Sequence, residues 1–243
     1  PGAAAADAAK ARWDAAFAAA SCPTAHHAKR LVRAEARANR DLTYGELDFW
    51  AAALVLERAF GDEVDMFCDL GSGVGRVTLA AALLRPDVDV LGIEIAAPLH
   101  AVAARAQAAV AYPNCSHVAG DFLDEASLAW RADALFANST AFSPGLIRGL
   151  EARARLLQTG AVVVTLTTKL DAPHLELVDQ FDVPASWGVA TAFVHRKREC
   201  AAVPRPRLSP ALGGRTAPDP VDLEDDEPVV FDAGQEIEVL GHD

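Results

Sequence analysis

Three glycines at alternate positions, Gly71, Gly73 and Gly75, follow an apolar run that ends close to an acidic residue, Asp69. Glycine has no Cβ and tolerates positive φ angles, so a backbone with these residues can approach a bound ligand closely. The amides that open the following helix would face the same ligand. The segment therefore predicts a strand, a tight turn and a helix that together hold a nucleoside-type cofactor.

The spacing of these glycines distinguishes between cofactors. The dinucleotide fingerprint is G-x-G-x-x-G, whereas this chain has Gly71, Gly73 and Gly75 two residues apart each time. With Asp69 just before them, this spacing favours S-adenosylmethionine over NAD. An NAD-dependent oxidoreductase remains an alternative, but the sequence has no obvious Tyr/Lys or Cys/His pair for redox chemistry.

Acidic residues also end the next two expected strands. Glu94 lies 19 residues beyond Gly75, about the distance that one helix and one strand require, and it can accept both ribose hydroxyls of a nucleoside. Asp121 ends the third strand and can accept a hydrogen bond from an adenine amino group. Phe122 beside it offers an apolar surface for the ring.

The fourth expected strand ends at Asn138, where the reacting methyl group of such a cofactor should lie. Amino methyltransferases of the adenine or glutamine type often have N-P-P-Y here, but this chain reads Asn138-Ser139-Thr140-Ala141. We expect Ser143 to cap the next helix, with Pro144 at its first position. Asn138 and Phe142 remain available for the substrate side of the site.

Alternating strands and helices position these residues. We expect helices near 74–85, 97–111 and 144–157, and strands near 64–70, 88–94, 116–120, 133–138, 161–168 and 189–196. This alternation predicts an α/β fold with a mostly parallel sheet and helices on both faces. Ligands of such sheets bind beyond the carboxyl ends of the strands, where the motifs above all lie.

The two flanks differ from this central region. Residues 4–40 are rich in helix-forming residues, and within them Lys29, Arg33 and Arg37 recur at i, i+4 and i+8, so they share one helix face. That face is either simply solvated or a contact for an acidic partner surface. We predict a helical segment over 1–42, a methyltransferase domain over 43–203 and a disordered, proline-rich acidic tail over 204–243.

Charge and cysteine usage limit the function further. The formal net charge is −12, and the tail from Pro204 has three Arg against ten acidic residues, which argues against simple nonspecific DNA binding. The four cysteines lack metal-like spacing and predict reduced thiols in a cytosolic or nuclear protein. Charged residues interrupt the Ala-rich start, and the apolar run 77–84 is too short for a membrane span, so we expect neither secretion nor a membrane anchor.

Four motifs in order carry a family resemblance. They are Thr43-Tyr44-Gly45-Glu46, Asp69 to Gly75, Gly120-Asp121-Phe122-Leu123, and Asn138 with Ala141-Phe142. Together they resemble the disruptor-of-telomeric-silencing family, the non-SET methyltransferases that act on lysine 79 of histone H3 in the nucleosome. Ser186-Trp187-Gly188 resembles a further element of that family, and the resemblance covers roughly residues 40–198.

The resemblance implies a Rossmann-like class I methyltransferase fold with a seven-stranded, mostly parallel sheet. It implies that Tyr44 and Glu46 belong to a loop that closes over the cofactor, and that Arg76 stands where family members commonly have Gln. The cofactor-binding residues it implies are Tyr44, Glu46, Asp69, Gly71, Ser72, Gly73, Gly75, Arg76, Glu94, Asp121, Phe122 and Asn138. The residues it implies on the catalytic side are Asn138, Phe142, Tyr44 and Phe193.

We hypothesise that Phe142 and Phe193 line a lysine channel and that Asn138 orients the amine through its side-chain carbonyl. The expected partners are histone H3 or the nucleosome, with a possible acidic-surface contact through Lys29, Arg33 and Arg37. A histone substrate implies a nuclear location, and otherwise the expectation is cytoplasmic. Two alternatives stay open: a class I methyltransferase for another protein lysine or a small molecule, and a non-catalytic S-adenosylmethionine-binding protein.

Overall fold

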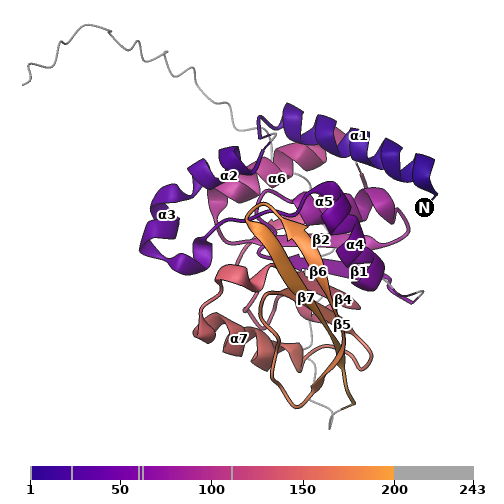
Figure 1. The fold of residues 1–243 in the computed structure, drawn as a ribbon, viewed down its shortest axis with the longest axis vertical. Coiled ribbons are helices and arrows are strands. Elements are labelled where there is room, and N and C mark those ends of the chain that lie inside the picture. Colours follow the sequence, from indigo (N-terminus) through magenta and orange to yellow (C-terminus); the bar gives the residue numbers. More distant parts are fainter. Residues whose placement is uncertain (1, 23, 60, 62, 111, 200–243) are drawn as a thin grey trace, which may run out of the picture. The chain divides into compact units, whose positions relative to one another are not determined.

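Seven strands pair into one sheet in the part of the chain that the computed structural model describes, in the order β3-β2-β1-β4-β5-β7-β6 (Figure 1). The strands are β1 (Met66–Leu70), β2 (Asp89–Glu94), β3 (Cys115–Ala119), β4 (Ala134–Ala137), β5 (Val162–Leu166), β6 (Leu175–Ala185) and β7 (Gly188–Lys197). The first five run parallel, whereas β7 pairs antiparallel with both β5 and β6. This confirms the expected seven-stranded, mostly parallel sheet.

The structure describes residues 2–22, 24–59, 61, 63–110 and 112–199. These residues belong to the first of two units, Pro1–Pro206, into which contacts divide the chain. The predicted tail over 204–243 lies outside the described residues. The predicted boundary between residues 42 and 43 stays a prediction.

The strand order reverses next to β1, which has β2 on one side and β4 on the other. Open α/β sheets bind ligands in the crevice at such a reversal, beyond the carboxyl ends of the strands. Register sets which strand ends meet there, since Leu70 lies opposite both Ile93 of β2 and Ala137 of β4. The motif residues that follow these three strands therefore gather at one edge of the sheet.

Helices cover both faces of the sheet, as expected. The longer helices are α1 (Ala3–Ala19), α2 (Ala25–Leu31), α3 (Arg33–Ala38), α4 (Phe49–Ala59), α5 (Arg76–Leu84), α6 (Ala97–Val110) and α7 (Pro144–Ala154). Phe67 and Phe136 face one core, which contains the buried residues of α1, α4, α5 and α6. Cys68 and Leu135 face the other core, with α7 and the short 3₁₀ helix η2 (Leu128–Arg131).

One strand was not expected from the sequence. The strand β6 lies at the edge of the sheet, and most of its residues are exposed or half-buried. It contains Pro184, which an edge strand tolerates because one side of the strand needs no ladder donors. Charged side chains and proline are typical of edge strands, where they prevent pairing with another chain. They also interrupt the alternating apolar pattern from which a strand is predicted.

None of the described helices is long and apolar enough to cross a membrane. Within the same residues, no cluster of histidine, cysteine and acidic side chains has the arrangement of a metal site.

Candidate functional site

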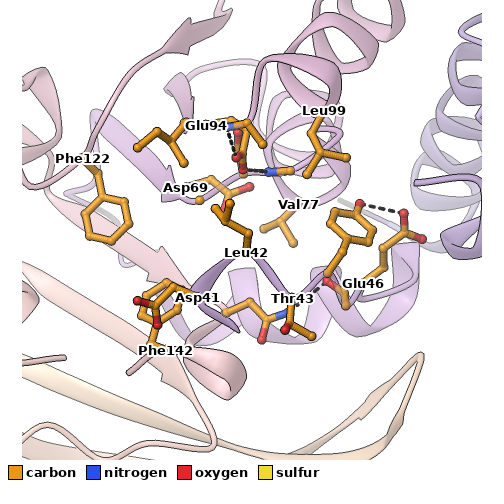
Figure 2. Close-up of a pocket in the computed structure, with 18 of the residues that line it drawn as sticks. Asp41, Leu42, Thr43, Glu46, Asp69, Val77, Glu94, Leu99, Phe122 and Phe142 are labelled. Atoms are coloured by element: carbon orange, nitrogen blue, oxygen red, sulfur yellow. Dashed lines mark hydrogen bonds between the residues drawn. The ribbon is translucent and has the colours of Figure 1, made fainter. Parts of the chain in front are cut away.

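A cavity of about 210 Å³ lies at the carboxyl ends of β1, β2 and β4 (Figure 2). Most of the residues selected from the sequence line it: Tyr44, Glu46, Asp69, Gly71, Ser72, Gly73, Arg76, Glu94, Asp121, Phe122, Asn138 and Phe142. Among the described residues, Gly75 and Phe193 were also selected but do not line it. Segments up to a hundred residues apart in the sequence thus meet at one site.

The turn after β1 has the backbone that its glycines predict. Gly71, Gly73 and Gly75 have φ angles of 71°, 58° and 84°, in the left-handed region that side chains with a Cβ disfavour. A Cβ added to Gly73 would come within 2.5 Å of the Tyr44 ring. The amides of Gly71 and Ser72 both donate to the carbonyl of Ile93 at 2.9 Å, which fixes the turn against the end of β2.

Two buried carboxylates stand at the back of the cavity. Asp69 is 3% exposed and accepts a hydrogen bond at 2.8 Å from the hydroxyl of Thr78. Burial raises its pKa from 3.8 to about 7, although the Thr78 hydrogen bond acts in the opposite direction. Glu94 accepts from the amides of Gly73 at 2.8 Å and Ala96 at 2.7 Å, and its pKa is raised by burial as well.

Two aromatic rings form one side of the cavity. Phe122, directly after Asp121, stacks on Phe142 with ring centroids 5.9 Å apart and an interplanar angle of 22°. In Figure 2 this pair and Glu46 stand at opposite sides of the pocket, with Asp69 and Glu94 between them. An apolar slot on one side and carboxylates behind it suit a ligand with a flat ring and polar hydroxyl or amino groups.

The loop between the 3₁₀ helix η1 (Arg40–Leu42) and α4 forms the opposite side and is tied down at several points. The side-chain amide of Asn138, after β4, donates to the carbonyl of Gly45 at 3.1 Å. The amide of Glu46 donates to the Ser186 hydroxyl at 3.1 Å, and the amide of Ser186 donates back to the Glu46 carbonyl at 2.9 Å. The loop is therefore held by β4 and by the turn between β6 and β7.

The tryptophan of the same turn covers this loop. A Cβ added to Gly45 would lie 2.4 Å from the ring of Trp187, so a glycine at this position lets the indole pack against the backbone. The Ser186-Trp187-Gly188 element that stood out in the sequence is thus the segment that touches the loop containing Tyr44.

Tyr44 and Glu46 are connected to each other within the loop. The hydroxyl of Tyr44 donates to Glu46 Oε1 at 2.7 Å. Burial raises the pKa of Tyr44 well above its usual value, and the neighbouring Glu46 carboxylate raises it further. Tyr44 therefore stays a neutral hydrogen-bond donor at physiological pH.

Arg76 joins this loop to the N-terminal helices. Its side chain is 4% exposed, and its Nε lies 3.2 Å from Glu46 Oε1. Its Nη2 donates to the carbonyl of Cys22 at 2.8 Å, and its guanidinium carbon lies 4.0 Å from the ring centroid of Phe17 and 4.8 Å from that of Trp13. The Trp13 indole in turn donates to the Arg76 carbonyl at 3.0 Å. A buried cation thus connects α1, the start of α5 and the pocket loop.

Sequence reasoning missed one wall of the cavity. Asp41 and Leu42 line it, and the Asp41 carboxylate accepts from both the backbone amide and the hydroxyl of Ser143. The hydroxyl of Ser143 also accepts from the amide of Leu146, which confirms the predicted cap before Pro144. No short-range pattern could reveal the pairing of Asp41 with Ser143, because 102 residues separate them.

Phe193 does not line the cavity. It sits on β7 opposite Thr165 of β5 and Gln180 of β6. Thr165 in turn lies opposite Ala137 of β4, so Phe193 is level with the residue before Asn138, with β5 between them. Its place in a lysine channel stays a prediction. The side-chain carbonyl of Asn138 accepts from the Thr140 hydroxyl at 3.0 Å.

The sequence model of the histone methylation protein DOT1 matches residues 24–176. The chain belongs to the DOT1 family. This membership confirms the resemblance found in the sequence, and the sheet order and helices of this DOT1 family member are those of the Rossmann-like class I methyltransferase fold. Family and fold agree with the expected enzyme class, a methyltransferase. No curated protein sequence matches the chain significantly.

Solved structures agree on the fold. TrmN from Thermus thermophilus superposes with a TM-score of 0.53 and 21% identity, over 67% of this chain and 52% of that one. This DOT1 family member therefore spans about half the length of that relative. The [4+2]-cyclase SpnF superposes with a TM-score of 0.52 and 14% identity, over 62% of this chain and 81% of that one.

Proposed function

We propose that the chain is an S-adenosylmethionine-dependent protein-lysine N-methyltransferase of the histone H3 lysine-79 type. The observation that carries this proposal is the single cavity in which the glycine turn, Glu94 and Asp121 meet Asn138 and Phe142. The glycine turn, Glu94 and Asp121 are suited to the cofactor, whereas Asn138 and Phe142 are suited to the methyl acceptor. Membership of the DOT1 family supports a histone substrate in general.

The residues around the cavity fit S-adenosylmethionine chemically. The side chain of Asp69 can bind a cationic amino group. The buried hydroxyl of Ser72 and Nη1 of Arg76 have no hydrogen-bond partner among the described residues. Buried polar atoms without partners are rare in folded proteins and suit a site that a polar ligand completes. Asp69, Gly71 and Gly73 would hold the methionine part.

The other end of the cavity suits the nucleoside. Glu94 would hold the ribose, because each carboxylate oxygen keeps a lone pair beyond its backbone hydrogen bond. Asp121 and Phe122 would hold the adenine. The cofactor would supply an electrophilic methyl carbon on a sulfonium, whose carbon–sulfur bond breaks to leave a neutral thioether. The chain's own residues bind, orient and exclude water.

A lysine amine must be neutral to attack. Phe142 provides an apolar wall, and an apolar channel lowers the pKa of a lysine because it desolvates the ammonium form. Asn138 fixes the pocket loop through its amide and can orient the amine with the remaining lone pair of its carbonyl. The loop, held by Asn138, Ser186 and Arg76, keeps water from the reacting atoms.

The test is methyl transfer from radiolabelled S-adenosylmethionine, with recombinant nucleosomes and free histones offered separately. Label on histone H3 in nucleosomes that disappears when its lysine 79 is replaced would support both the activity and the substrate. Cofactor binding without label on histones would contradict the histone proposal and favour another protein lysine or a small molecule. An Asp69→Asn variant serves as the control that loses cofactor binding. A histone substrate would also place the protein in the nucleus.

A further inference from the structure

A second concavity, of about 350 Å³, lies between the N-terminal helices and the pocket loop. We call it the basic groove, and it is lined by Lys29, Val32, Arg33, Ala36, Arg37, Thr43 and Tyr44. The helix breaks at Val32, between α2 and α3, yet Lys29, Arg33 and Arg37 still face the same space. The face anticipated from their spacing therefore borders a concavity.

The three cations at the rim are free to meet an anion. Lys29, Arg33 and Arg37 are exposed, and none of them forms an ion pair with a side chain that the structure describes. The carboxylates on the adjoining segment are already engaged. Asp41 accepts from Ser143, and Glu46 accepts from Tyr44 and pairs with Arg76, so neither forms an ion pair with the three cations.

The floor of the basic groove is apolar. Val32 is 1% exposed, Ala36 is half-buried and the half-buried Tyr44 forms the end nearest the central cavity. Cations around an apolar floor suit a segment that carries both acidic and apolar side chains, because each kind then finds a matching surface.

The basic groove is continuous with the cavity proposed for the cofactor. Thr43 and Tyr44 line both, and the Tyr44 ring packs against the position of Gly73 in the glycine turn. A ligand in the groove would therefore contact the same tyrosine that borders the cavity. Because the basic groove lies beside the cavity, it is suited to bind a part of the acceptor molecule other than the residue that is methylated.

The charge of the whole protein favours a peptide over a nucleic acid. The formal net charge is −12, so the protein as a whole has no electrostatic attraction for a duplex, which carries negative charge along its whole length. A short segment needs only the local field of the groove, because charges farther than a Debye length of about 8 Å are largely screened at physiological salt.

We propose that the basic groove is a docking site for an acidic, partly apolar peptide segment of the protein that is methylated. That the segment belongs to the methyl acceptor rests on the proposed function. The docking itself does not, because it depends on the three cations and the apolar floor. A peptide bound in the groove would contact Tyr44 and bring the acceptor to the mouth of the cavity.

The experiment measures fluorescence anisotropy of a labelled peptide of alternating Glu and Leu with one central Lys, against a matched peptide with Gln for Glu. The groove variant is Lys29→Glu/Arg33→Glu/Arg37→Glu. We expect it to weaken binding of the acidic peptide about tenfold or more, since each exposed ion pair contributes modestly and three are reversed. Higher salt should weaken wild-type binding as well.

A matched control changes the net charge equally at other sites. The side chains of Arg131, Arg148 and Arg155 are exposed and take part in no hydrogen bond or ion pair that the structure describes, and the control variant changes all three to Glu. It should leave peptide binding within about twofold, and both variants should bind S-adenosylmethionine like the wild type.

Three results would overturn the proposal. Equal weakening by the two triple variants would show an effect of net charge alone. Equal binding of the Glu and Gln peptides would exclude acidic recognition. Tighter binding of a short DNA duplex, lost in the groove variant, would assign the groove to nucleic acid. Peptide binding without methyl transfer to any histone would leave the docking site intact and contradict the proposed function.

Discussion

Replacement of Arg76 by glutamine would test the buried connection between α1 and the pocket loop. The variant removes the cation that lies 3.2 Å from Glu46 Oε1 and leaves that carboxylate in a position where its side chain is 8% exposed. It also removes the guanidinium group from the rings of Phe17 and Trp13 and the hydrogen bond to the Cys22 carbonyl.

The expected loss of stability follows from the burial of the pair. Removal of one partner from a buried ion pair costs about 3–5 kcal/mol, because the other charge stays buried without compensation. Contacts between a cation and an aromatic ring contribute about 0.5–2 kcal/mol, but they overlap with the first quantity. We therefore expect Arg76→Gln to lower the free energy of unfolding by about 4 kcal/mol. For a domain of this size, that corresponds to a Tm lower by roughly 10 °C.

Urea unfolding of four proteins measures the coupling: wild type, Arg76→Gln, Glu46→Gln and the double variant. Glu46→Gln keeps an acceptor for the Tyr44 hydroxyl, so it removes charge while conserving shape. If the pair is coupled, the double variant loses less than the sum of the single variants, by about 0.5–3 kcal/mol. Additive losses, or a loss below about 1 kcal/mol for Arg76→Gln, would refute the reasoning.

Three further outcomes are expected. Gly73→Ala should abolish cofactor binding in calorimetry, because its φ is 58° and the new Cβ would meet the Tyr44 ring, whereas a wild-type affinity would exclude the turn from the site. The raised pKa of Asp69 means that its contribution to stability is full below pH 4 and is lost as pH rises through about 7. Cofactor binding near pH 6.5 should therefore release a proton, which calorimetry in buffers of different ionisation enthalpy measures, and binding without proton release would contradict the raised pKa. Asn138→Ala should lower kcat at least tenfold and also weaken cofactor binding, because the Gly45 carbonyl loses its donor; an unchanged kcat would remove Asn138 from the mechanism.

The glycine turn and the acidic residue that follows the second strand could be predicted from the sequence, because short segments determine their structure. Glycine permits the positive φ angles of Gly71, Gly73 and Gly75, and Glu94 reaches the same turn because parallel strands share an edge. The convergence of these residues is thus a property of the alternating pattern and needs no knowledge of distant contacts.

The anchors of the pocket loop could not be predicted in this way. Glu46 and Ser186 are separated by 140 residues, and Asn138 and Gly45 by 93. In the sequence, Arg76 is notable only because it stands where members of the family commonly have Gln. Nothing near it indicates that two aromatic side chains of α1 contact it. Charged residues are almost never fully buried unless they are paired, so its burial depends on partners that the sequence does not place.

The reciprocal hydrogen bonds between Glu46 and Ser186 also have a consequence for biosynthesis. During translation, the loop near residue 46 leaves the ribosome long before the turn that anchors it. The parallel strands β1 to β5 can pair in the meantime, because domains begin to fold as their chain emerges. The side of the cavity that contains Tyr44 gains its anchors from Ser186 and Trp187 only when the β6–β7 hairpin arrives. A nascent chain that stops before this hairpin would hold the glycine turn but not the finished pocket.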